Sequence, residues 1–214
     1  MANYKKDFFL KTQFITKLNN HQNQTIVAYG TSLTEGGSWV KDLADALEKK
    51  FPGLATVINS GGSGQWSRWG VANLEERVIS KKPDVIFIEF AVNDSVARFN
   101  GSVEEARQNL NFIIKRILEC NSKCEIILMT MTPADKHPVG HFSYRLNITD
   151  YYAMYREEAK KHQLMLIDHA PNWLALQASD KALFDKLVPD SIHPTVEGNA
   201  LIVTPLILKS LGLN

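Results

Sequence analysis

Three polar residues from the two ends of the chain have the types that nucleophilic catalysis requires. Ser32 follows a short apolar run and Gly30, whereas Asp190 and His193 stand three residues apart near the C-terminus. Across one turn, a carboxylate can hold the tautomer of an imidazole, and that imidazole can take a proton from a serine hydroxyl and return it to a leaving group. These residues fit a Ser-His-Asp triad. The structural alternatives are a serine that bonds its own turn and an aspartate that caps a helix beside a surface histidine.

Two further segments offer hydrogen-bond donors to the oxygen that becomes negative during acyl transfer. Gly64 ends the glycine-rich run NSGGSG (59–64) and can present a backbone N–H with no side chain in the way. Asn93, in the run AVND (91–94), can present a side-chain amide. Loss of one such donor typically raises the barrier by about 2.7 to 4 kcal/mol. Each segment alone is weak evidence, because glycine-rich turns are common and an Asn-Asp pair can simply cap a helix.

Ser63 and a pair of histidines could support other chemistry. Ser63 lies between two glycines, but a nucleophile elbow has the pattern Gly-x-Ser-x-Gly, and Gln65 occupies its final position here. His137 and His141 have the i, i+4 spacing of two metal ligands on a helix. A proline and a glycine between them favour a loop, and no Cys or acidic third ligand stands close by, so we expect no metal site.

Five short apolar runs are expected to form the strands that position these residues. The runs are mostly apolar instead of alternating, which is typical of strands buried on both faces, and helix-like segments separate them. This pattern predicts a parallel sheet with helices on both sides. Ligands bind beyond the carboxyl ends of such strands, where the candidate residues stand. The predicted strands are residues 24–30, 55–60, 84–90, 125–131 and 164–169.

Apolar residues at helical spacing mark the helices between these strands, with one face over residues 39–47 and another over residues 106–118. Ser102, followed three residues later by Glu105, resembles a capping box for the second helix. Pro194 is expected to begin the last helix, which runs to about Leu211. His193 would then lie at a helix N-terminus, where the helix dipole disfavours the imidazolium.

Length and charge restrict the domain organisation and the partner. A chain of 214 residues fits one α/β domain, so we expect a single domain over residues 1–214, with residues 1–23 as an N-terminal extension or helix. The 24 Lys and Arg residues balance 23 Asp and Glu residues without long blocks of one sign, which favours neither a nucleic acid nor an anionic membrane as partner. A small molecule is the expected partner, and the sequence makes no prediction of oligomeric state.

The cellular location is expected to be cytoplasmic. No run has the length of a signal peptide or of a membrane span. Cys120 and Cys124, the only cysteines, cannot form a disulfide framework and read as ordinary thiols near a helix end. A secreted mature form would have the same features.

Four sequence blocks taken together resemble those of the SGNH (GDSL) hydrolase family. The blocks GTSLTEGG, NSGGSG, AVND and DSIHP match in order and in strand position, over nearly the whole chain. The resemblance implies a three-layer α/β/α sandwich of flavodoxin-like topology with a five-stranded parallel sheet, and a serine esterase activity. It assigns the nucleophile to Ser32, the other triad members to Asp190 and His193, and the oxyanion hole to Gly64, Asn93 and the backbone N–H of Ser32. It implies no metal and no organic cofactor.

Two residues depart from the pattern of that family. The usual Gly-Asp-Ser is Gly30-Thr31-Ser32 here, and the glycine that usually opens the third block is Ala91. Neither change removes a catalytic group. We expect the missing carboxylate at Thr31 to alter the rigidity of the loop and the extra methyl group of Ala91 to narrow the site.

Polar and aromatic residues flank the predicted catalytic loops and suit a sugar better than a long acyl chain, which would need a continuous apolar groove. We therefore expect removal of a short acyl group, most simply acetyl, from a carbohydrate or a similar polar ester. A lysophospholipase or thioesterase, a flavodoxin-like nucleotide-binding module and an inactive binding protein on the same scaffold stay open, as does packing of the tryptophans against a helix. The substrate-binding candidates are Trp66, Arg68, Trp69, Arg98, Phe99, His137, His141 and Phe142.

Overall fold

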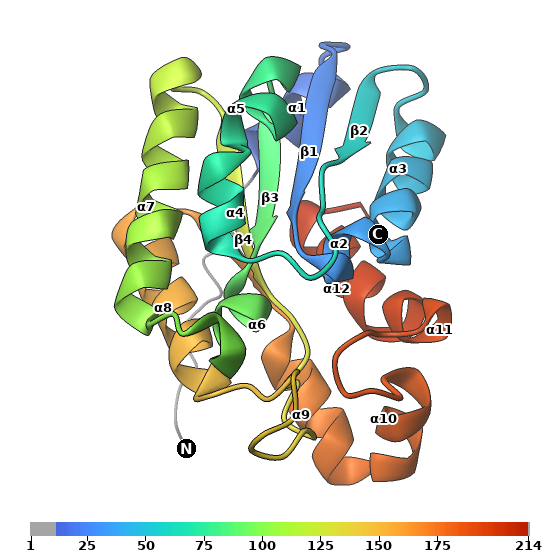
Figure 1. The fold of residues 1–214 in the computed structure, drawn as a ribbon. Helices are drawn as coiled ribbons and strands as arrows, with labels where there is room; N and C mark the ends of the chain where they lie inside the picture. The colour runs from blue at the N-terminus through green and yellow to red at the C-terminus, as the bar shows by residue number, and fades with distance from the viewer. Residues whose placement is uncertain (1–11, 214) are drawn as a thin grey trace, which may run out of the picture.

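The computed structural model describes residues 12–213 and contains a five-stranded parallel sheet (Figure 1). The strand order β2-β1-β3-β4-β5 is the flavodoxin-like order, so the predicted fold class is confirmed. Each strand begins and ends within one residue of its predicted bounds. The three central strands are almost entirely buried, as expected, whereas the two edge strands are only partly buried. The strands are β1 (Gln24–Gly30), β2 (Ala55–Asn59), β3 (Val85–Glu89), β4 (Glu125–Thr130) and β5 (Met165–Asp168).

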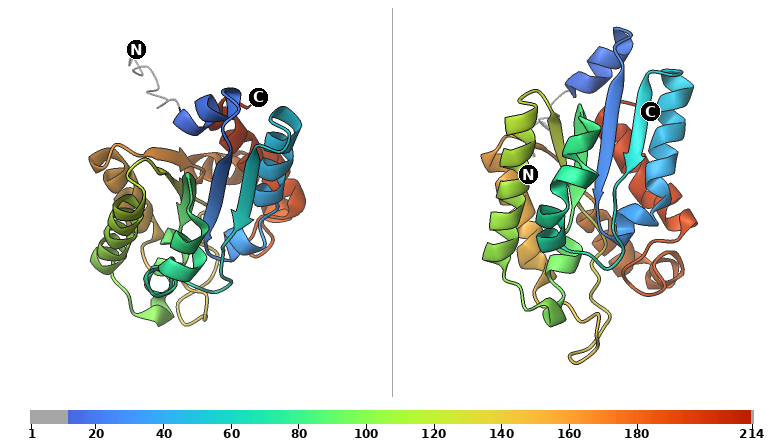
Figure 2. Two further views of the ribbon diagram at one scale, coloured as in Figure 1. Left: turned by 90° about the horizontal axis from the view of Figure 1, so that it is seen from above. Right: turned by 45° about the horizontal axis from the view of Figure 1, so that its top comes forward.

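Helices cover both faces of the sheet (Figures 1 and 2). On one face, α3 (Ser38–Lys50) contacts α12 (Thr204–Leu211). On the other face, α7 (Val103–Cys120) contacts both α4 (Ser67–Ala72) and α8 (Ile148–Lys161). Further helical segments are α1 (Gln13–Asn19), α5 (Leu74–Arg77), η1 (Ile79–Lys81), η2 (Ala97–Phe99), α9 (Ala170–Ser179) and α10 (Lys181–Leu187).

The amphipathic pattern predicted for residues 106–118 is confirmed in α7. Its apolar face is buried at Ala106, Leu110, Ile113, Ile114 and Ile117. The hydroxyl of Ser102 caps the helix by accepting a hydrogen bond from the Glu105 N–H at 3.1 Å. The Glu105 carboxylate binds Arg68 of α4 and thereby links the two helices.

The prediction that Pro194 begins the last helix is wrong. The first helical turn is α11 (Val196–Gly198), and Thr195 caps it, because the Thr195 hydroxyl accepts the Gly198 N–H at 3.1 Å. A π-helical segment, η3 (Asn199–Val203), then joins α11 to α12, which ends at Leu211 as expected. His193 therefore lies in the turn before the helix, and the dipole argument does not apply to it.

The N-terminal part of the described chain contains α1, in which Phe14 and Leu18 are buried. Residues 1–11 of the predicted extension lie outside the described residues. Cys120 is exposed at the end of α7 and Cys124 is buried, and both are free thiols. No helix among residues 12–213 is long and apolar enough to cross a membrane.

Candidate active site

Ser32 opens a one-turn helix, α2 (Ser32–Glu35), at the carboxyl end of β1. Thr31 caps this helix through its hydroxyl, which accepts the Leu33 N–H at 3.1 Å. The Ser32 side chain is half-exposed, and its Oγ lies 2.8 Å from Nε2 of His193. The structure thus brings a serine hydroxyl and an imidazole into hydrogen-bond contact across 161 residues of sequence.

The Asp190 carboxylate orients His193 from the other side. Oδ2 of Asp190 lies 2.6 Å from Nδ1 of His193, and Oδ1 accepts the backbone N–H groups of Ile192 and His193 at 2.9 and 2.7 Å. Partial burial alone would raise the pKa of Asp190, but the bonds from the His193 ring and from these two N–H groups outweigh it and hold the pKa below its usual value. Asp190 is therefore a carboxylate at neutral pH, with one oxygen held by the backbone and the other facing the imidazole.

The three groups predicted to form an oxyanion hole each keep an N–H that can bind a ligand. The backbone N–H groups of Ser32 and Gly64 have no acceptor among residues 12–213. Gly64 has φ +70°, a left-handed conformation that favours glycine. Asn93 lies in α6 (Ala91–Asp94), and its Nδ2 donates one hydrogen to Gln65 O at 2.8 Å, which leaves its second hydrogen for a ligand.

Arg145 holds the other end of the Asn93 side chain, and no sequence pattern indicates this role. Its Nη2 donates to Oδ1 of Asn93 at 3.1 Å, while Nε and Nη1 donate to the carbonyl oxygens of Val92 and Ser143, each at 2.8 Å. Burial lowers the pKa of Arg145 to about 10, so the guanidinium remains charged at neutral pH. Both ends of the Asn93 amide are therefore bonded, and its O and N positions are determined by their partners.

Glu89 lies directly behind the nucleophile turn. It is the last residue of β3, pairs in register with Gly30 of β1, and is 1% exposed. Its carboxylate accepts the Thr31 N–H at 2.7 Å and the hydroxyls of Thr31 and Thr34 at 3.0 and 2.7 Å. Burial raises the pKa of Glu89 to about 7 in spite of these bonds. Sequence reasoning passed over Glu89, although a charged residue within the apolar stretch VIFIEF (85–90) was a usable signal.

Ala91 does not narrow the site as expected. It is 1% exposed and packs into the core, and it does not line the pocket beside Ser32. We expected the missing carboxylate at position 31 to alter the rigidity of the loop. In the structure a different carboxylate, that of Glu89, bonds the N–H and the hydroxyl of Thr31 and holds the loop.

Most of the substrate-binding candidates form one stacked row, which we call the aromatic ladder. Trp66 and Phe99 stack with 4.9 Å between ring centroids, and the Arg68 guanidinium lies 4.5 Å from the Trp66 ring. Arg98 continues the row, at 5.1 Å from the Phe99 ring and 5.5 Å from the Phe142 ring.

Two histidines complete the aromatic ladder on the loop after β4. The His141 ring lies 4.5 Å from Phe142 and stacks on His137 at 4.1 Å. Burial, followed by the charges of His141 and Arg145, lowers the pKa of His137, and Asp190 acts in the opposite direction. The predicted loop is confirmed at both histidines, and no group of three possible metal-binding side chains occurs in the part of the chain that the structure describes.

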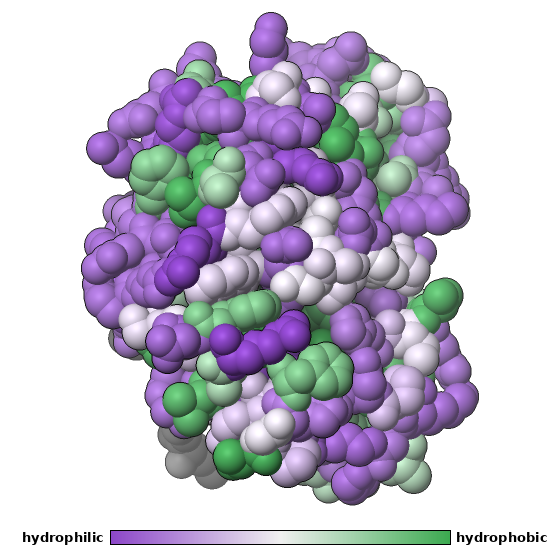
Figure 3. Space-filling model, viewed as in Figure 1, coloured by the Kyte–Doolittle hydropathy of each residue, from purple (hydrophilic) through white to green (hydrophobic). Residues whose placement is uncertain are grey.

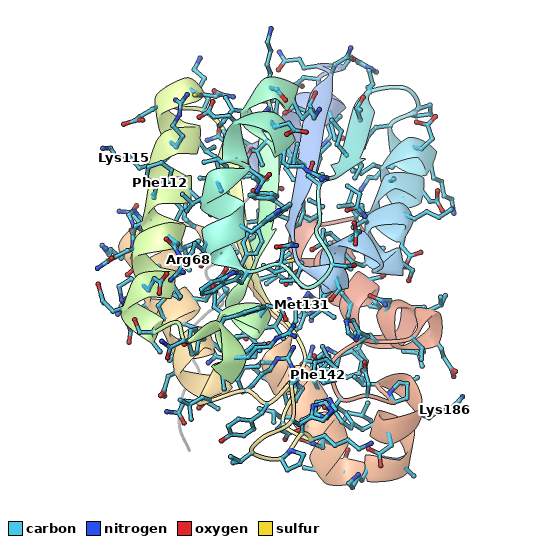
Figure 4. All side chains as sticks on the ribbon, in the orientation of Figure 1. Arg68, Phe112, Lys115, Met131, Phe142 and Lys186 are labelled. Carbon is cyan, nitrogen blue, oxygen red and sulfur yellow. The ribbon has the colours of Figure 1, made fainter. Side chains whose placement is uncertain are left out.

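Trp69 does not belong to the aromatic ladder. Its ring lies 5.8 Å from Tyr29 and 6.4 Å from Phe90, so it packs α4 against the sheet, as the structural alternative predicted. Figure 4 shows Arg68 on α4 and Phe142 on the loop after β4, both near the end of the sheet where α6 lies. One end of the ladder, at Trp66, follows Gln65, whose carbonyl bonds Asn93, and the other end, at His137, lies close enough to Asp190 for that carboxylate to affect its pKa.

A pocket of about 280 Å³ opens beside Ser32 and His193, and Leu33, Gly37 and Pro194 contribute to its walls. Two larger hollows, of about 430 Å³ each, lie elsewhere: one at the start of β4 and β5, and one beside the end of α7. In a parallel sheet ligands bind at the carboxyl ends of the strands, so the smaller pocket is the relevant one. Ser63 also lines it, but the Ser63 hydroxyl is bound by the Glu35 carboxylate and not by an imidazole.

The sequence matches a known protein family over most of its length. Residues 28–201 match the model of the GDSL-like Lipase/Acylhydrolase family. The chain belongs to this family. The match covers most of the chain, so the predicted SGNH (GDSL) membership and the prediction of a carboxylic ester hydrolase are both confirmed.

Individual relatives of this family member are distant in sequence but similar over nearly their whole length. An arylesterase of Vibrio mimicus is 24% identical, with 88% of this chain and 89% of that protein covered. The uncharacterized lipoprotein YqeF of Bacillus subtilis is 24% identical, with 84% and 86% covered. A catalytic mutant of an acetylxylan esterase from Geobacillus stearothermophilus has the same fold, with a TM-score of 0.74 at 22% identity over 90% of this chain and 96% of that one.

Proposed function

We propose that this GDSL-family hydrolase is a serine acetylesterase that removes acetyl groups from a carbohydrate or a similar polar ester. The observation that carries the proposal is the linked pair of contacts at His193, 2.8 Å to Ser32 Oγ and 2.6 Å to Asp190 Oδ2. This pair supplies a nucleophile, a base and a group that orients the base, which is the arrangement of a Ser-His-Asp triad.

In the first half of the reaction, Ser32 Oγ attacks the ester carbonyl and His193 Nε2 takes the hydroxyl proton. The carbonyl oxygen becomes negative and accepts hydrogen bonds from the N–H groups of Ser32 and Gly64 and from Nδ2 of Asn93. When the tetrahedral intermediate collapses, the bond to the alcohol oxygen breaks, and His193 gives its proton to that oxygen. The sugar hydroxyl leaves and Ser32 carries the acetyl group.

In the second half, His193 takes a proton from water, and the resulting hydroxide attacks the acetyl carbonyl of the acyl-enzyme. The same three donors stabilise the second tetrahedral intermediate, and the proton on His193 returns to Ser32 Oγ as acetate leaves. Asp190 stabilises the imidazolium in both halves without taking its proton. Apart from the attacking water, the proposed steps use only side chains and backbone groups of the chain.

The shape of the site supports a short acyl group on a polar alcohol. The pocket beside Ser32, at about 280 Å³, lies just below the range of roughly 300–1,000 Å³ for small-molecule sites. On the face shown in Figure 3, hydrophobic residues near the site form small separate patches between hydrophilic ones, not a continuous groove for a long chain. The flat rings and cations of the aromatic ladder suit a sugar, and the acetylxylan esterase of similar fold acts on an acetylated carbohydrate by its name.

The alternative activities make different demands on this site. A lysophospholipase or a thioesterase for long acyl chains would need a longer apolar groove, so activity should rise with acyl length. A nucleotide phosphate on the GTSLTEGG loop would meet Thr31 and Thr34 hydroxyls that are already donated to the Glu89 carboxylate.

A series of p-nitrophenyl esters from acetate to decanoate tests the acyl part of the proposal. We expect the highest kcat/KM on acetate and no turnover by Ser32→Ala. A maximum on long chains would move the function to lipid or thioester substrates, and unchanged turnover by Ser32→Ala would refute the serine mechanism.

Acetylated xylo-oligosaccharides test the carbohydrate part. Trp66→Ala should raise KM for the oligosaccharide and leave KM for p-nitrophenyl acetate nearly unchanged, because packing of a sugar ring against the flat face of the indole is lost only for the oligosaccharide. Phe112→Ala is the matched control, since Phe112 is an exposed ring, at 50% exposure, on α7 and outside the ladder (Figure 4). Equal KM values for wild type and Trp66→Ala on the oligosaccharide would contradict the assignment of the ladder to sugar binding.

A further inference from the structure

We propose that Glu89 is a positioning residue for the nucleophile, holding the turn that carries Ser32 through a carboxylate supplied by the central sheet. The inference rests on the proposed function, because it treats Ser32 as the attacking group. Glu89 does not touch Ser32. It acts through Thr31, the residue that precedes Ser32 and caps the helix that Ser32 opens.

The contacts of the Glu89 carboxylate converge on this one turn. Oε1 accepts from the Thr31 N–H and from the Thr31 and Thr34 hydroxyls, and Oε2 lies 3.1 Å from the Thr31 hydroxyl. These bonds reach residues on both sides of Ser32. The direction of the Ser32 Oγ and of its backbone N–H is therefore set by a group in β3.

Gly30 shows that the space is shaped for a carboxylate. A Cβ atom added at Gly30 would meet Glu89 Oε1 at 2.3 Å and Thr34 Oγ1 at 2.6 Å, so no other residue type fits beside this cluster. The two strands are paired in register at this point, Gly30 with Glu89. The pairing of the two strands therefore holds the Glu89 carboxylate close to the backbone of Gly30.

The energetics also point to a role in function. A carboxyl group that is 1% exposed is destabilising unless it is fully bonded, and an apolar side chain at the end of β3 would avoid this cost. Every described bond of the Glu89 carboxylate goes to the turn of Ser32. The bonds lie where they would hold the nucleophile rigidly in position.

Moving the carboxylate from position 89 to position 31 tests the inference. Glu89→Gln keeps the shape but loses one acceptor, and we expect kcat on p-nitrophenyl acetate to fall about 10- to 100-fold with KM changed less than about twofold, since a misplaced nucleophile affects the chemical step. Thr31→Asp alone would place two carboxylates in contact and should lower kcat at least as much. In Glu89→Gln/Thr31→Asp, the new carboxylate can accept from the new amide, so kcat should recover at least about tenfold over Glu89→Gln.

Control variants separate positioning from general destabilisation. Glu158→Gln removes another carboxylate that is 1% exposed, between α7 and α8, and should lower the melting temperature without lowering kcat. Thr34→Val removes a single bond to Glu89 and should lower kcat in the same direction but less than Glu89→Gln. It keeps the inference testable if Glu89→Gln fails to fold.

The outcomes distinguish this inference from the proposed function. If Ser32→Ala is inactive but Glu89→Gln has the kcat of wild type, or if the double variant shows only the product of the two single losses, the positioning role is wrong and the esterase mechanism stands. If Ser32→Ala hydrolyses the ester normally, both fail together. Loss in each single variant with recovery in the double variant would support the inference.

Discussion

Arg145→Met is the substitution that most sharply tests how the oxyanion hole is assembled. Methionine preserves much of the length of the side chain but removes the three donors to Asn93 Oδ1, Val92 O and Ser143 O. The Asn93 amide then keeps only its bond to Gln65 O and can rotate. The donor aimed at the substrate would be present for only part of the time.

The size of the effect has an upper limit set by Asn93 itself. Complete loss of an oxyanion donor lowers kcat by about 100- to 1,000-fold. Partial misplacement of Asn93 should therefore lower kcat by about 10- to 100-fold, or about 1.4 to 2.7 kcal/mol of barrier, with little change in KM. The bonds to the two carbonyl oxygens contribute to folding, so the variant should also melt at a lower temperature.

The assay is steady-state hydrolysis of p-nitrophenyl acetate well below the melting temperature of every variant. Arg156→Met is the matched control, because Arg156 bonds Asp168 at 2.7 and 3.0 Å and does not contact the site. If Arg145 acts through Asn93, adding Arg145→Met to Asn93→Ala should lower kcat no further. Multiplicative losses in that double variant, or wild-type kcat in Arg145→Met, would refute this reasoning.

Three further predictions follow from the site and from one buried histidine. Asn93→Ala should lower kcat about 100- to 1,000-fold at nearly constant KM, and a change confined to KM would contradict its role as an oxyanion donor. Arg98→Gln should raise KM for acetylated oligosaccharides several-fold with kcat unchanged, as steady-state kinetics on these substrates and on p-nitrophenyl acetate would show. Burial lowers the pKa of His169 to about 4. Below about pH 6.5 the unfolded chain therefore binds a proton at this residue that the folded protein does not bind. The free energy of unfolding should fall by up to about 3 kcal/mol as the pH is lowered from 7 to 4. Urea unfolding of wild type and His169→Leu at both pH values checks this, because identical pH dependence would contradict it.

The parts of the fold that follow local rules could be predicted from the sequence. Runs such as DVIFIEF are mostly apolar because both faces of the strand are covered, and such runs located all five strands. The start of the last helix could not be decided in this way, because Pro194 and Thr195 are both good starting residues. The bond from Gly198 to the Thr195 hydroxyl settles it, and this bond depends on the path of the preceding turn.

Some residues of the candidate site could likewise be predicted from the sequence, and others could not. Ser32, Gly64, Asn93, Asp190 and His193 stand in short blocks that are visible in the sequence. The structure joins Ser32, His193 and Asp190 by hydrogen bonds, and it bonds Asn93 to Gln65, the residue after Gly64. Arg145 reaches Asn93 across 52 residues from a loop without a motif, so only the folded chain reveals the contact. The aromatic ladder was predicted as a set of residues, but its order depends on three separate loops.

Covalent labelling with a fluorophosphonate, followed by peptide mapping by mass spectrometry, tests the central claim most directly. The account predicts one adduct, on Ser32, that forms in proportion to the loss of esterase activity. The adduct should be absent in Ser32→Ala and should still form in Ser63→Ala, because the Ser63 hydroxyl is bound by Glu35 and has no imidazole partner. An adduct on Ser63, or sustained hydrolysis of p-nitrophenyl acetate without any adduct on Ser32, would contradict the claim that Ser32 is the nucleophile.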